Sequence, residues 1–569
     1  MRGFLFKQDE GVNSLMNARA RMAYPRWSRK SQEISLDTTE KIILKIMSFK
    51  KTTSLFNGYF DNNNAIFAIK KILHQEVDIS LLSLLSLNSK AHEKEISYRY
   101  NPSKVLDSVI FDTVHFAHLD KGRDPLLRIK LWCSVLFKLE KELLKLLCRL
   151  IVISKNITFG KVARKSYLFG IENATSTHRP GRTTGFNFII DGVQVKKDDL
   201  IVFMARGNSL LDEIDKGGYN YIFFKDLKCP LKWYIKKVKT LFVFVVKLFL
   251  VNVSLSPIDL LIKSYALKII GSSLKWELLM KNYYIKNIFD VEEHSFSHIV
   301  KTLILSKYDC RNVRLPYAQL DIHNSFLAYI YYTYFFSSGK YLPGTFSSSW
   351  SKDTKIVEVG VWRNDDLFID DSENAEIKLR NLVSQVYGQR KVITIFPSSS
   401  AIPERDLELV EIGVKVLEHY RDCILFVKIK GGHNKYFSQS PIKEKIQPYI
   451  DQNRLFLLTR GNGWYSTPQY MFKYSTLNLA ICGSVIVESL MASAPIFVVS
   501  SSFVFDTPFT KRLKRHILFD DPEKLWVAIK DYLETGDKSI FRFSDYYEWC
   551  DQYRDGKATE RIRDQLLNN

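Results

Sequence analysis

The sequence has few cysteines, and none of them stand in a CxxC arrangement. Its seven cysteines are scattered between Cys133 and Cys550. Disulfide frameworks are found in short, cysteine-dense secreted chains, and structural zinc sites need closely spaced cysteine or histidine pairs. The cysteine pattern therefore argues against both and predicts a reducing compartment.

Long apolar runs are also scarce. Residues 241–255 (LFVFVVKLFLVNVSL) span 15 residues and contain Lys247. A helix that crosses a bilayer needs about 20 apolar residues, so this run is too short. Residues 232–240 precede it with lysines, Trp233 and Tyr234, a pattern typical of a helix at an anionic membrane surface. We expect residues 232–255 to attach to a membrane peripherally; a buried helix of the first domain is the alternative.

Residues 126–153 show helical spacing of apolar residues that is broken by charges every few positions. This pattern predicts an amphipathic helix, packed on the body of the protein or on a membrane surface. The first residues, MRGFLFKQDEGVNS, have no apolar core and no small-residue cleavage site, which predicts no secretory signal. The expected location is cytoplasmic, with peripheral attachment to the inner face of the cell membrane.

Acidic residues fall well short of basic ones. The chain has 82 Lys and Arg against 61 Asp and Glu, a formal net charge of +21. Such an excess indicates an anionic partner, which could be nucleic acid, acidic lipid or a phosphorylated substrate. The lysines accompany apolar segments, and no Arg-rich groove with spaced aromatic residues is evident. Nucleic-acid binding is therefore the least favoured of the three.

At 569 residues the chain is too long for one hydrophobic core. We expect an α/β fold with two Rossmann-like domains and an additional, mainly helical N-terminal region. The expected boundaries are 1–160 for the helical region of unknown role, 161–385 for the first Rossmann-like domain and 386–569 for the second.

The first α/β domain is expected from short apolar runs separated by polar turns. Strands are predicted at 186–190, 199–205 and 219–224, a helix at 209–216, and a helix at 287–305 that begins with acidic residues. Arg206 and Asn208 stand in the turn after a predicted strand. There they would contact an acceptor or a phosphate, or serve simple turn chemistry. His294 and His298 stand four apart without a third ligand, so no metal site is predicted.

The carboxyl half alternates strands and helices most clearly. Strands are predicted at 391–396, 423–429, 455–458, 477–482 and 496–499, and helices at 404–420 and 485–492. This order predicts a doubly wound parallel sheet, which binds ligands at the carboxyl ends of its strands. Ser484 at the turn after one strand and Glu488 four residues later would face such a ligand. The alternative is a capping serine and a solvated glutamate.

Three segments carry a resemblance to a known group. Residues 426–433 (FVKIKGGH) resemble a strand that ends in a Lys-x-His-Pro signature, although Asn434 replaces the proline. Residues 484–495 (SVIVESLMASAP) resemble a Ser-x-x-x-Glu-Ala-x-x-x-Gly-x-Pro helix, with Ser493 in place of the glycine. Residues 553–562 (YRDGKATERI) resemble a carboxyl-terminal DGxAxxRI segment. In this order they resemble surface-polysaccharide glycosyltransferases of GT-B type, including relatives of CDP-glycerol glycerophosphotransferases and capsule proteins.

The resemblance implies transfer of a sugar or a glycerophosphate-type group from a nucleotide-activated donor to a growing surface glycan or lipid-linked acceptor. Implied donor-binding residues are Lys428, Lys430, His433, Ser484 and Glu488. His323 would be the catalytic base, since imidazole titrates near neutral pH, with Asp321 as the second candidate. For His323 a hydrogen-bonded turn histidine, and for Lys428 a solvated edge-strand lysine, are the alternatives.

Cations and helix N-termini can stabilise a leaving phosphate without a metal ion. The pairs Asp365–Asp366 and Asp370–Asp371 are interpreted as solvated charge in a linker. We therefore expect no required divalent metal and no cofactor besides the donor substrate. A noncatalytic GT-B scaffold in the same kind of pathway is the main alternative to an enzyme, because Ser493 and Asn434 depart from the motif.

Overall fold

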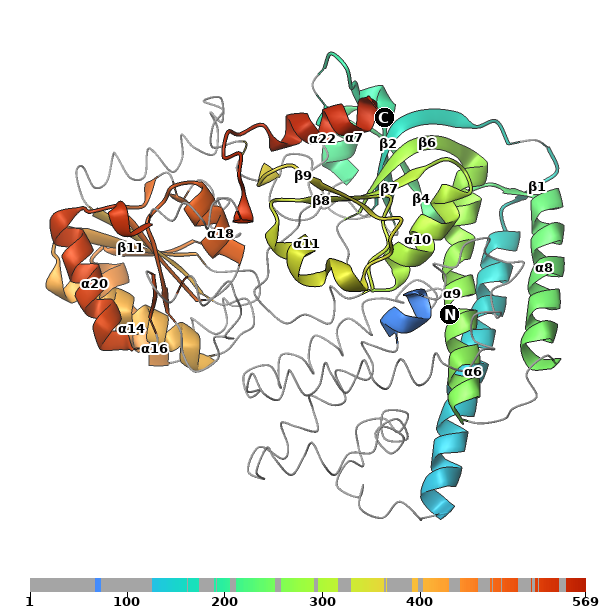
Figure 1. Cartoon of the computed structure of the whole chain (residues 1–569), viewed down its shortest axis with the longest axis horizontal. Coiled ribbons are helices and arrows are strands. Elements are labelled where there is room, and N and C mark those ends of the chain that lie inside the picture. The colour runs from blue at the N-terminus through green and yellow to red at the C-terminus, as the bar shows by residue number, and fades with distance from the viewer. Residues whose placement is uncertain are drawn as a thin grey trace. The chain divides into compact units, whose positions relative to one another are not determined.

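The fold is described from a computed structural model in which the chain divides into two compact units (Figure 1). The first unit contains Met1–Leu315, Asn324–Phe336 and Thr345–Val357, and the second contains Pro316–His323, Ser337–Gly344 and Glu358–Asn569. The structure describes residues 67–72, 125–160, 162–172, 189–190, 192–204, 211–250, 257–290, 295–315, 329–362, 365, 391–397, 403–428, 441–458, 471–472, 474–481, 484–499, 513, 517–519, 521–541 and 549–568.

A seven-stranded sheet forms the centre of the first unit. Its order is β4-β3-β2-β6-β7-β8-β9, and the recorded strand pairs are parallel. The strands are β2 (Lys165–Glu172), β3 (Leu200–Met204), β4 (Asn220–Phe223), β6 (Tyr283–Asp290), β7 (Arg311–Arg314), β8 (Tyr334–Ser337) and β9 (Lys355–Glu358). The chain runs outward in one direction from β2 and in the other from β6. A topological switch point therefore lies between these two strands.

Strands β2 and β3 are in close contact at Gly170 and Phe203. A Cβ added at Gly170 in β2 would lie 2.6 Å from the Phe203 ring of β3, so any larger residue here would force this buried ring to move. Strand β2 was not predicted from the sequence. A strand was expected at residues 186–190, but Ile189 and Ile190, its described members, lie outside any strand.

The segment from residue 287 was expected to be helical, and its first part is not. Residues 287–290 complete β6, and helix α10 (Ser297–Ser306) begins seven residues later. The acidic residues suggested a helix N-terminus, but the apolar run before them continues the strand, where Ile288 and Phe289 are buried. The strand predicted at 199–205 is confirmed as β3, and the helix at 209–216 is observed as α7 (Leu211–Gly217).

Three long helices share one hydrophobic core in the first unit (Figure 1). They are α6 (Pro125–Ser154), α8 (Leu231–Leu250) and α9 (Pro257–Asn282). A two-stranded parallel ribbon, β1 (Ile157–Thr158) with β5 (Cys229–Pro230), joins the end of α6 to the beginning of α8. Helix α9 carries the fully buried Trp276, while α8 buries only one of its faces.

A six-stranded parallel sheet forms the centre of the second unit, in the order β12-β11-β10-β13-β14-β15. The strands are β10 (Lys391–Phe396), β11 (Cys423–Lys428), β12 (Leu455–Leu458), β13 (Leu477–Ile481), β14 (Ile496–Val499) and β15 (Leu518–Phe519). Five of these strands were predicted within one residue at each end. Their continuous apolar runs are typical of strands that are covered on both faces.

Helices of the second unit begin and end where the sequence signals them. Helix α14 (Pro403–His419) begins with a proline, which fits a first helical turn that needs no amide donor. Helix α20 (Pro522–Thr535) is capped by Asp521, whose carboxylate accepts from Glu523 N at 2.9 Å, and ends at left-handed Gly536. Helices α16 (Pro441–Asp451) and α20 each form an ion pair with α14, and α18 (Ser484–Met491) follows β13.

Candidate functional site

The switch point of the second sheet lies between β10 and β13. Strands β11 and β12 follow β10 on one side, and β14 and β15 follow β13 on the other. Ligands of doubly wound sheets bind in the crevice at the carboxyl ends of the strands at this point. Phe396 and Ile481 end the two strands here. The carboxyl end of β13 at Ile481 thus lies at the edge of the sheet where this fold binds ligands.

Helix α18 presents its N-terminus at the same edge of the sheet. It begins at Ser484, three residues after β13 ends, and runs for eight residues. The first amides of a helix have no intrahelical acceptor, and the helix dipole adds partial positive charge there. A phosphate is therefore favoured at this position. The predicted helix over 485–492 is confirmed, with both ends shifted by one residue.

Lys428 ends β11, directly beside β10. Strand β11 lies between β10 and β12, and only 9% of Lys428 is exposed. Its interpretation as a solvated edge-strand lysine is therefore wrong, because the strand is interior and the side chain is covered. A lysine buried at a strand end places a positive charge close to the switch point.

Glu488 lies one turn into α18. Only 7% of Glu488 is exposed, so the interpretation as a solvated glutamate is also wrong. Carboxylates accept hydrogen bonds from hydroxyl groups, such as those of a sugar or a ribose. The described part of this site thus holds helix amides, a cation and a carboxylate, groups that are chemically able to bind a phosphate and hydroxyls.

Six predicted site residues lie outside the described residues. They are Lys430, His433, His323, Asp321, Arg206 and Asn208. In sequence, Lys430 and His433 follow β11 by two and five positions, and Arg206 and Asn208 follow β3 by two and four.

The opposite end of α18 is closed by a Schellman motif. Ala494 N donates to Ser489 O at 2.9 Å, and Ser493 N donates to Leu490 O at 2.9 Å. Ser493 has φ +55°, the left-handed conformation that this motif requires and that glycine adopts most easily. The position at which the related motif carries glycine thus keeps the glycine conformation in this chain.

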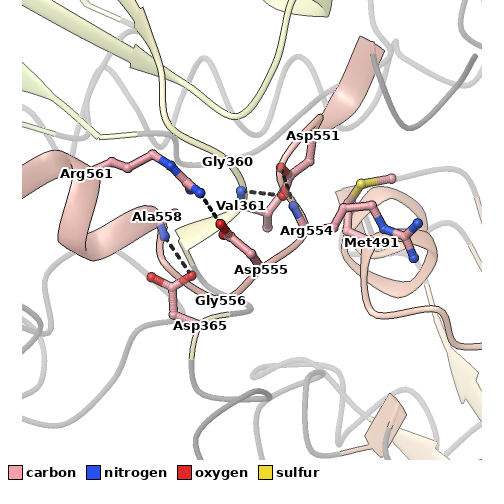
Figure 2. A pocket seen from close by; sticks show the side chains of 10 residues that line it. All are labelled: Gly360, Val361, Asp365, Met491, Asp551, Arg554, Asp555, Gly556, Ala558 and Arg561. Atoms are coloured by element: carbon pink, nitrogen blue, oxygen red, sulfur yellow. Dashed lines mark hydrogen bonds and ion pairs between the residues drawn. The ribbon is translucent and has the colours of Figure 1, made fainter.

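The DGxAxxRI segment folds against residues 359–362 and Asp365, and it frames a solvent-open space of about 210 Å³ (Figure 2). Asp551 accepts from the backbone amides of Val361 at 2.8 Å, Tyr553 at 3.0 Å and Arg554 at 3.2 Å. Burial raises the pKa of Asp551, and these hydrogen bonds oppose that rise. Arg561 Nη1 donates to Val359 O at 2.8 Å.

Asp365 caps helix α22 (Ala558–Leu567) from outside the helix. Its carboxylate accepts from Ala558 N at 3.2 Å and from Thr559 N at 2.6 Å, and only 6% of the residue is exposed (Figure 2). Its interpretation as solvated linker charge is therefore wrong, because its lone pairs satisfy helix amides. Asp366, Asp370 and Asp371 lie outside the described residues.

Five residues of this segment have local structural roles. Gly556 has φ +70°, Asp555 forms an ion pair with Arg561, and Ala558 and Ile562 are buried. The carboxylates of Asp365 and Asp551 face backbone amides. The segment therefore forms a clasp at the C-terminal end of α18, the end opposite to Ser484. It contacts the C-terminal end of α18 through Arg554 and Ser493, and it does not belong to the switch-point site.

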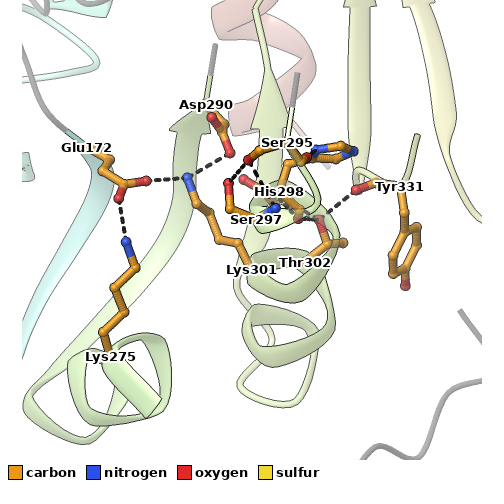
Figure 3. Close-up of polar contacts among 10 residues, drawn as sticks. Glu172, Lys275, Asp290, Ser295, Ser297, His298, Lys301, Thr302 and Tyr331 are labelled. Atoms are coloured by element: carbon orange, nitrogen blue, oxygen red, sulfur yellow. Dashed lines mark hydrogen bonds and ion pairs between the residues drawn. The ribbon is translucent and has the colours of Figure 1, made fainter. Parts of the chain in front are cut away.

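The switch point of the first sheet holds a chain of charges that sequence reasoning missed (Figure 3). Glu172 ends β2 and Asp290 ends the neighbouring β6. Lys301 of α10 lies between them, with Nζ 2.6 Å from Glu172 Oε2 and 2.7 Å from Asp290 Oδ2. Lys275 of α9 approaches Glu172 Oε1 at 3.0 Å from the more exposed side. The negative charges of two carboxylates and the positive charges of two ammonium groups therefore cancel.

The electrostatics favour the ionised forms of Glu172 and Lys301. Burial alone would raise the pKa of Glu172, but the charges and hydrogen bonds of Lys275 and Lys301 outweigh it and lower that pKa to about 2. Burial likewise opposes the charged form of Lys301, yet Asp290 and Glu172 raise its pKa above the usual value. In the sequence, this site is signalled only by a carboxylate at the end of each of two apolar strands, Glu172 in β2 and Asp290 in β6.

His298 on α10 has a structural environment. Its Nδ1 lies 2.5 Å from Ser295 O (Figure 3). It is fully buried, and its ring stacks on Tyr332 with a centroid distance of 4.8 Å. Asn312 and Tyr331 extend this network through Thr302, whose Oγ1 donates to Tyr331 O at 2.8 Å. His294 lies outside the described residues.

Comparison with known proteins finds similar structures at low sequence identity. No protein-family model and no curated protein sequence matches the chain. Among solved structures, the wall teichoic acid polymerase TagF is 12% identical, covering 77% of this chain and 97% of that chain with a TM-score of 0.44. A UDP-N-acetylglucosamine 2-epimerase is 13% identical (71% and 96% covered, TM-score 0.43). Anabaena Alr3699/HepE, in complex with UDP and glucose, is 11% identical (70% and 95% covered, TM-score 0.38).

Identities of 11 to 13% and TM-scores below 0.5 transfer neither a substrate nor a residue role to this chain.

Proposed function

We propose that this protein is a transferase of GT-B type that uses a nucleotide-activated donor. The observation that carries the proposal is the position of α18 at the switch point of the second sheet. Its N-terminus would bind the donor phosphates together with Lys428, and Glu488 would accept from sugar or ribose hydroxyls. The transferred group would be a sugar or a glycerophosphate-type group.

The proposed chemistry needs two further elements. Negative charge that develops on the leaving phosphate would be stabilised by Lys428 and the amides of α18, with Lys430 and His433 as further candidates. An acceptor hydroxyl would lose its proton to His323, or to Asp321 as the second candidate. No divalent metal is required in this proposal. The two α/β units would act as facing donor and acceptor domains, with Arg206 and Asn208 on the acceptor side.

The acceptor would be a growing surface glycan or a lipid-linked precursor, reached from the cytoplasmic face of a membrane. What favours an enzyme over a noncatalytic scaffold is the backbone at Ser493. It keeps the left-handed conformation of the missing glycine, so this departure leaves the capping of α18 intact. The scaffold alternative is now supported only by Asn434.

Binding of donors to the purified full chain tests the proposal. CDP-, CMP-, UDP- and GDP-linked donors are each titrated, with thermal stabilisation and calorimetry as readouts. At least one donor should bind, and Lys428→Met and Glu488→Gln should each weaken it by about tenfold or more, since each removes a charged partner in a covered site. Lys443→Met on exposed α16 is the matched control and should bind normally.

Three outcomes would overturn parts of the proposal. A folded protein that binds none of the donors excludes a donor site. If a donor binds but is neither transferred nor hydrolysed, and His323→Ala leaves its binding unchanged, the scaffold is favoured. Tight binding to nucleic acid with a steep salt dependence, and none to donors, favours the nucleic-acid alternative.

A further inference from the structure

Helix α8 has one buried face and one exposed face. Leu241, Phe244 and Leu248 are buried in the core of the first unit. On the buried side, Lys237 forms an ion pair with Glu277 of α9 at 2.5 Å. The body of the protein therefore fixes the rotation of α8 about its own axis. The side chains that remain on the outside are set by this packing.

The exposed face of α8 is apolar to an unusual degree. Phe242 is 68% exposed, Leu250 is 69% exposed, and Ile235 is 58% exposed. Val238, Val243 and Phe249 are also exposed. Large apolar side chains gathered on one exposed helix face indicate an interaction surface, whereas isolated ones would not.

The same face is positively charged. Lys232, Lys236, Lys239 and Lys247 are exposed on α8, and the helix contains no Asp or Glu. The first three follow one another at helical spacing and lead to Phe242. Apolar side chains flanked by lysines, without acidic residues, match the surface of a bilayer that contains anionic lipids. A soluble acidic protein would match the charges but not this many exposed phenylalanine and leucine side chains.

Helix α6 adds a second apolar stripe. Its exposed side chains include Phe137 at 66%, Leu144 at 59% and Ile151 at 59%, together with Leu136 and Leu147. The ribbon of β1 and β5 holds the end of α6 beside the beginning of α8. In the ribbon's following turn, Phe159 is 91% exposed. Both helices also pack into the same core (Figure 1).

Neither helix is suited to cross a bilayer. Among the described residues, no helix combines the length and apolar character that a membrane span needs. Helix α8 also keeps its inner face in the protein core, so it can only lie along a surface.

We propose that the exposed faces of α6 and α8 form a membrane-docking surface that binds anionic bilayers. The apolar side chains of both helices enter the interfacial region, and the lysines of α8 contact lipid phosphates. This inference is independent of the donor site, because no residue of the second unit takes part in it.

The test is sedimentation of the full-length protein with vesicles of neutral phosphatidylcholine, and with vesicles that contain 30% phosphatidylglycerol. Binding is expected to the anionic vesicles and to weaken with salt. The triple variant Lys232→Glu, Lys236→Glu, Lys239→Glu should reduce the partition coefficient by roughly fivefold for each charge removed. The double variant Phe242→Asp, Leu250→Asp should abolish binding at all salt concentrations.

Matched controls separate the surface from global charge and from folding. Lys443→Glu, Lys524→Glu, Lys538→Glu changes the net charge equally but on the second unit, and it should bind vesicles normally. Val527→Asp alters an exposed apolar residue on α20 and should also bind normally. Circular dichroism and donor binding verify that each variant is folded.

Two results would overturn the proposal. Equal binding of wild type and both α8 variants to anionic vesicles would place the membrane contact elsewhere. Absence of vesicle binding, with self-association that Phe242→Asp, Leu250→Asp abolishes, would assign the surface to a second copy of the chain.

Discussion

The hydroxyl of Ser493 accepts a hydrogen bond from Arg554 Nη2, across 61 positions of sequence. Both residues have positive φ, +55° for Ser493 and +50° for Arg554. Ser493 ends the Schellman motif of α18, and Arg554 belongs to the clasp that contacts residues 359–362 and Asp365. The contact therefore connects the rear of the proposed donor helix to the carboxyl-terminal segment. It also gives the serine a role that glycine could not fill.

Substitutions at Ser493 should separate the cost of its left-handed backbone conformation from the contribution of its hydrogen bond with Arg554. Ser493→Ala keeps the left-handed strain and loses the hydrogen bond, so it should destabilise the second unit by about 1 kcal/mol. Ser493→Gly loses the bond but relieves strain of about 1 kcal/mol, and should be nearly neutral. Chemical denaturation measures both. A double-mutant cycle with Arg554→Met should give a coupling of about 1 kcal/mol, and zero coupling would contradict the contact.

Removing Lys301, the central lysine at the switch point of the first sheet, should lower the stability of the protein far more than the substitutions at Ser493. Lys301→Met leaves buried Asp290 and the largely covered Glu172 without their shared cation, and only Glu172 keeps a second partner in Lys275, so the expected cost is about 3 to 5 kcal/mol. Adding Glu172→Gln and Asp290→Asn to this variant should restore much of the stability, because no carboxylate is then left without a cation and Lys275 is exposed enough to be solvated. Lys307→Met, at the exposed end of the same helix, is the control and should change stability by less than about 0.5 kcal/mol.

Acid should weaken the first unit through Glu172. The pKa of this carboxyl is lowered from 4.5 to about 2, so its contribution is fully present above pH 4.5 and is lost as pH falls toward 2. We expect wild type to lose roughly 2 to 3 kcal/mol more than Glu172→Gln over this interval. Hydrogen exchange of β2 and α10 amides measures the difference. Parallel pH profiles for the two proteins would refute the assignment.

The cap of α22 provides a test of the clasp. Asp365→Ala leaves the amides of Ala558 and Thr559 without their acceptor and should cost about 1 to 2 kcal/mol. Asp365→Asn keeps one acceptor oxygen and should cost less. Asp564→Asn, an exposed carboxylate on the same helix, serves as control. Faster hydrogen exchange at the start of α22 should appear only in the Asp365 variants.

Chelation tests the proposal that no metal is needed. Once a donor has been identified, transfer measured with EDTA should stay within about twofold of transfer measured with added Mg²⁺, since Lys428 and helix amides would carry the phosphate charge. Lys428→Met should lower transfer under both conditions. A loss of activity with EDTA that Mg²⁺ restores would show that the phosphate is held by a metal instead.

The second sheet was readable from sequence because each strand is a continuous apolar run bounded by turns. Strands β10, β11, β13 and β14 are interior and covered, so their residue pattern and their environment agree. The first sheet was less readable. The acidic residues that follow Phe289 resemble the first turn of a helix, although the chain is still in β6 at Asp290.

The sequence by itself determined the α/β class, most strands of the second sheet and the position of α18, since these depend on local apolar periodicity. It also predicted an amphipathic segment at residues 232–255. Only the tertiary structure decided which side chains are covered: Lys428 and Glu488 are buried, and Asp365 caps a helix 193 positions away. The charge chain of Glu172, Lys301 and Asp290 depends on contacts across as many as 129 positions. Local patterns carry no information on such contacts, because sheet order and helix packing create them.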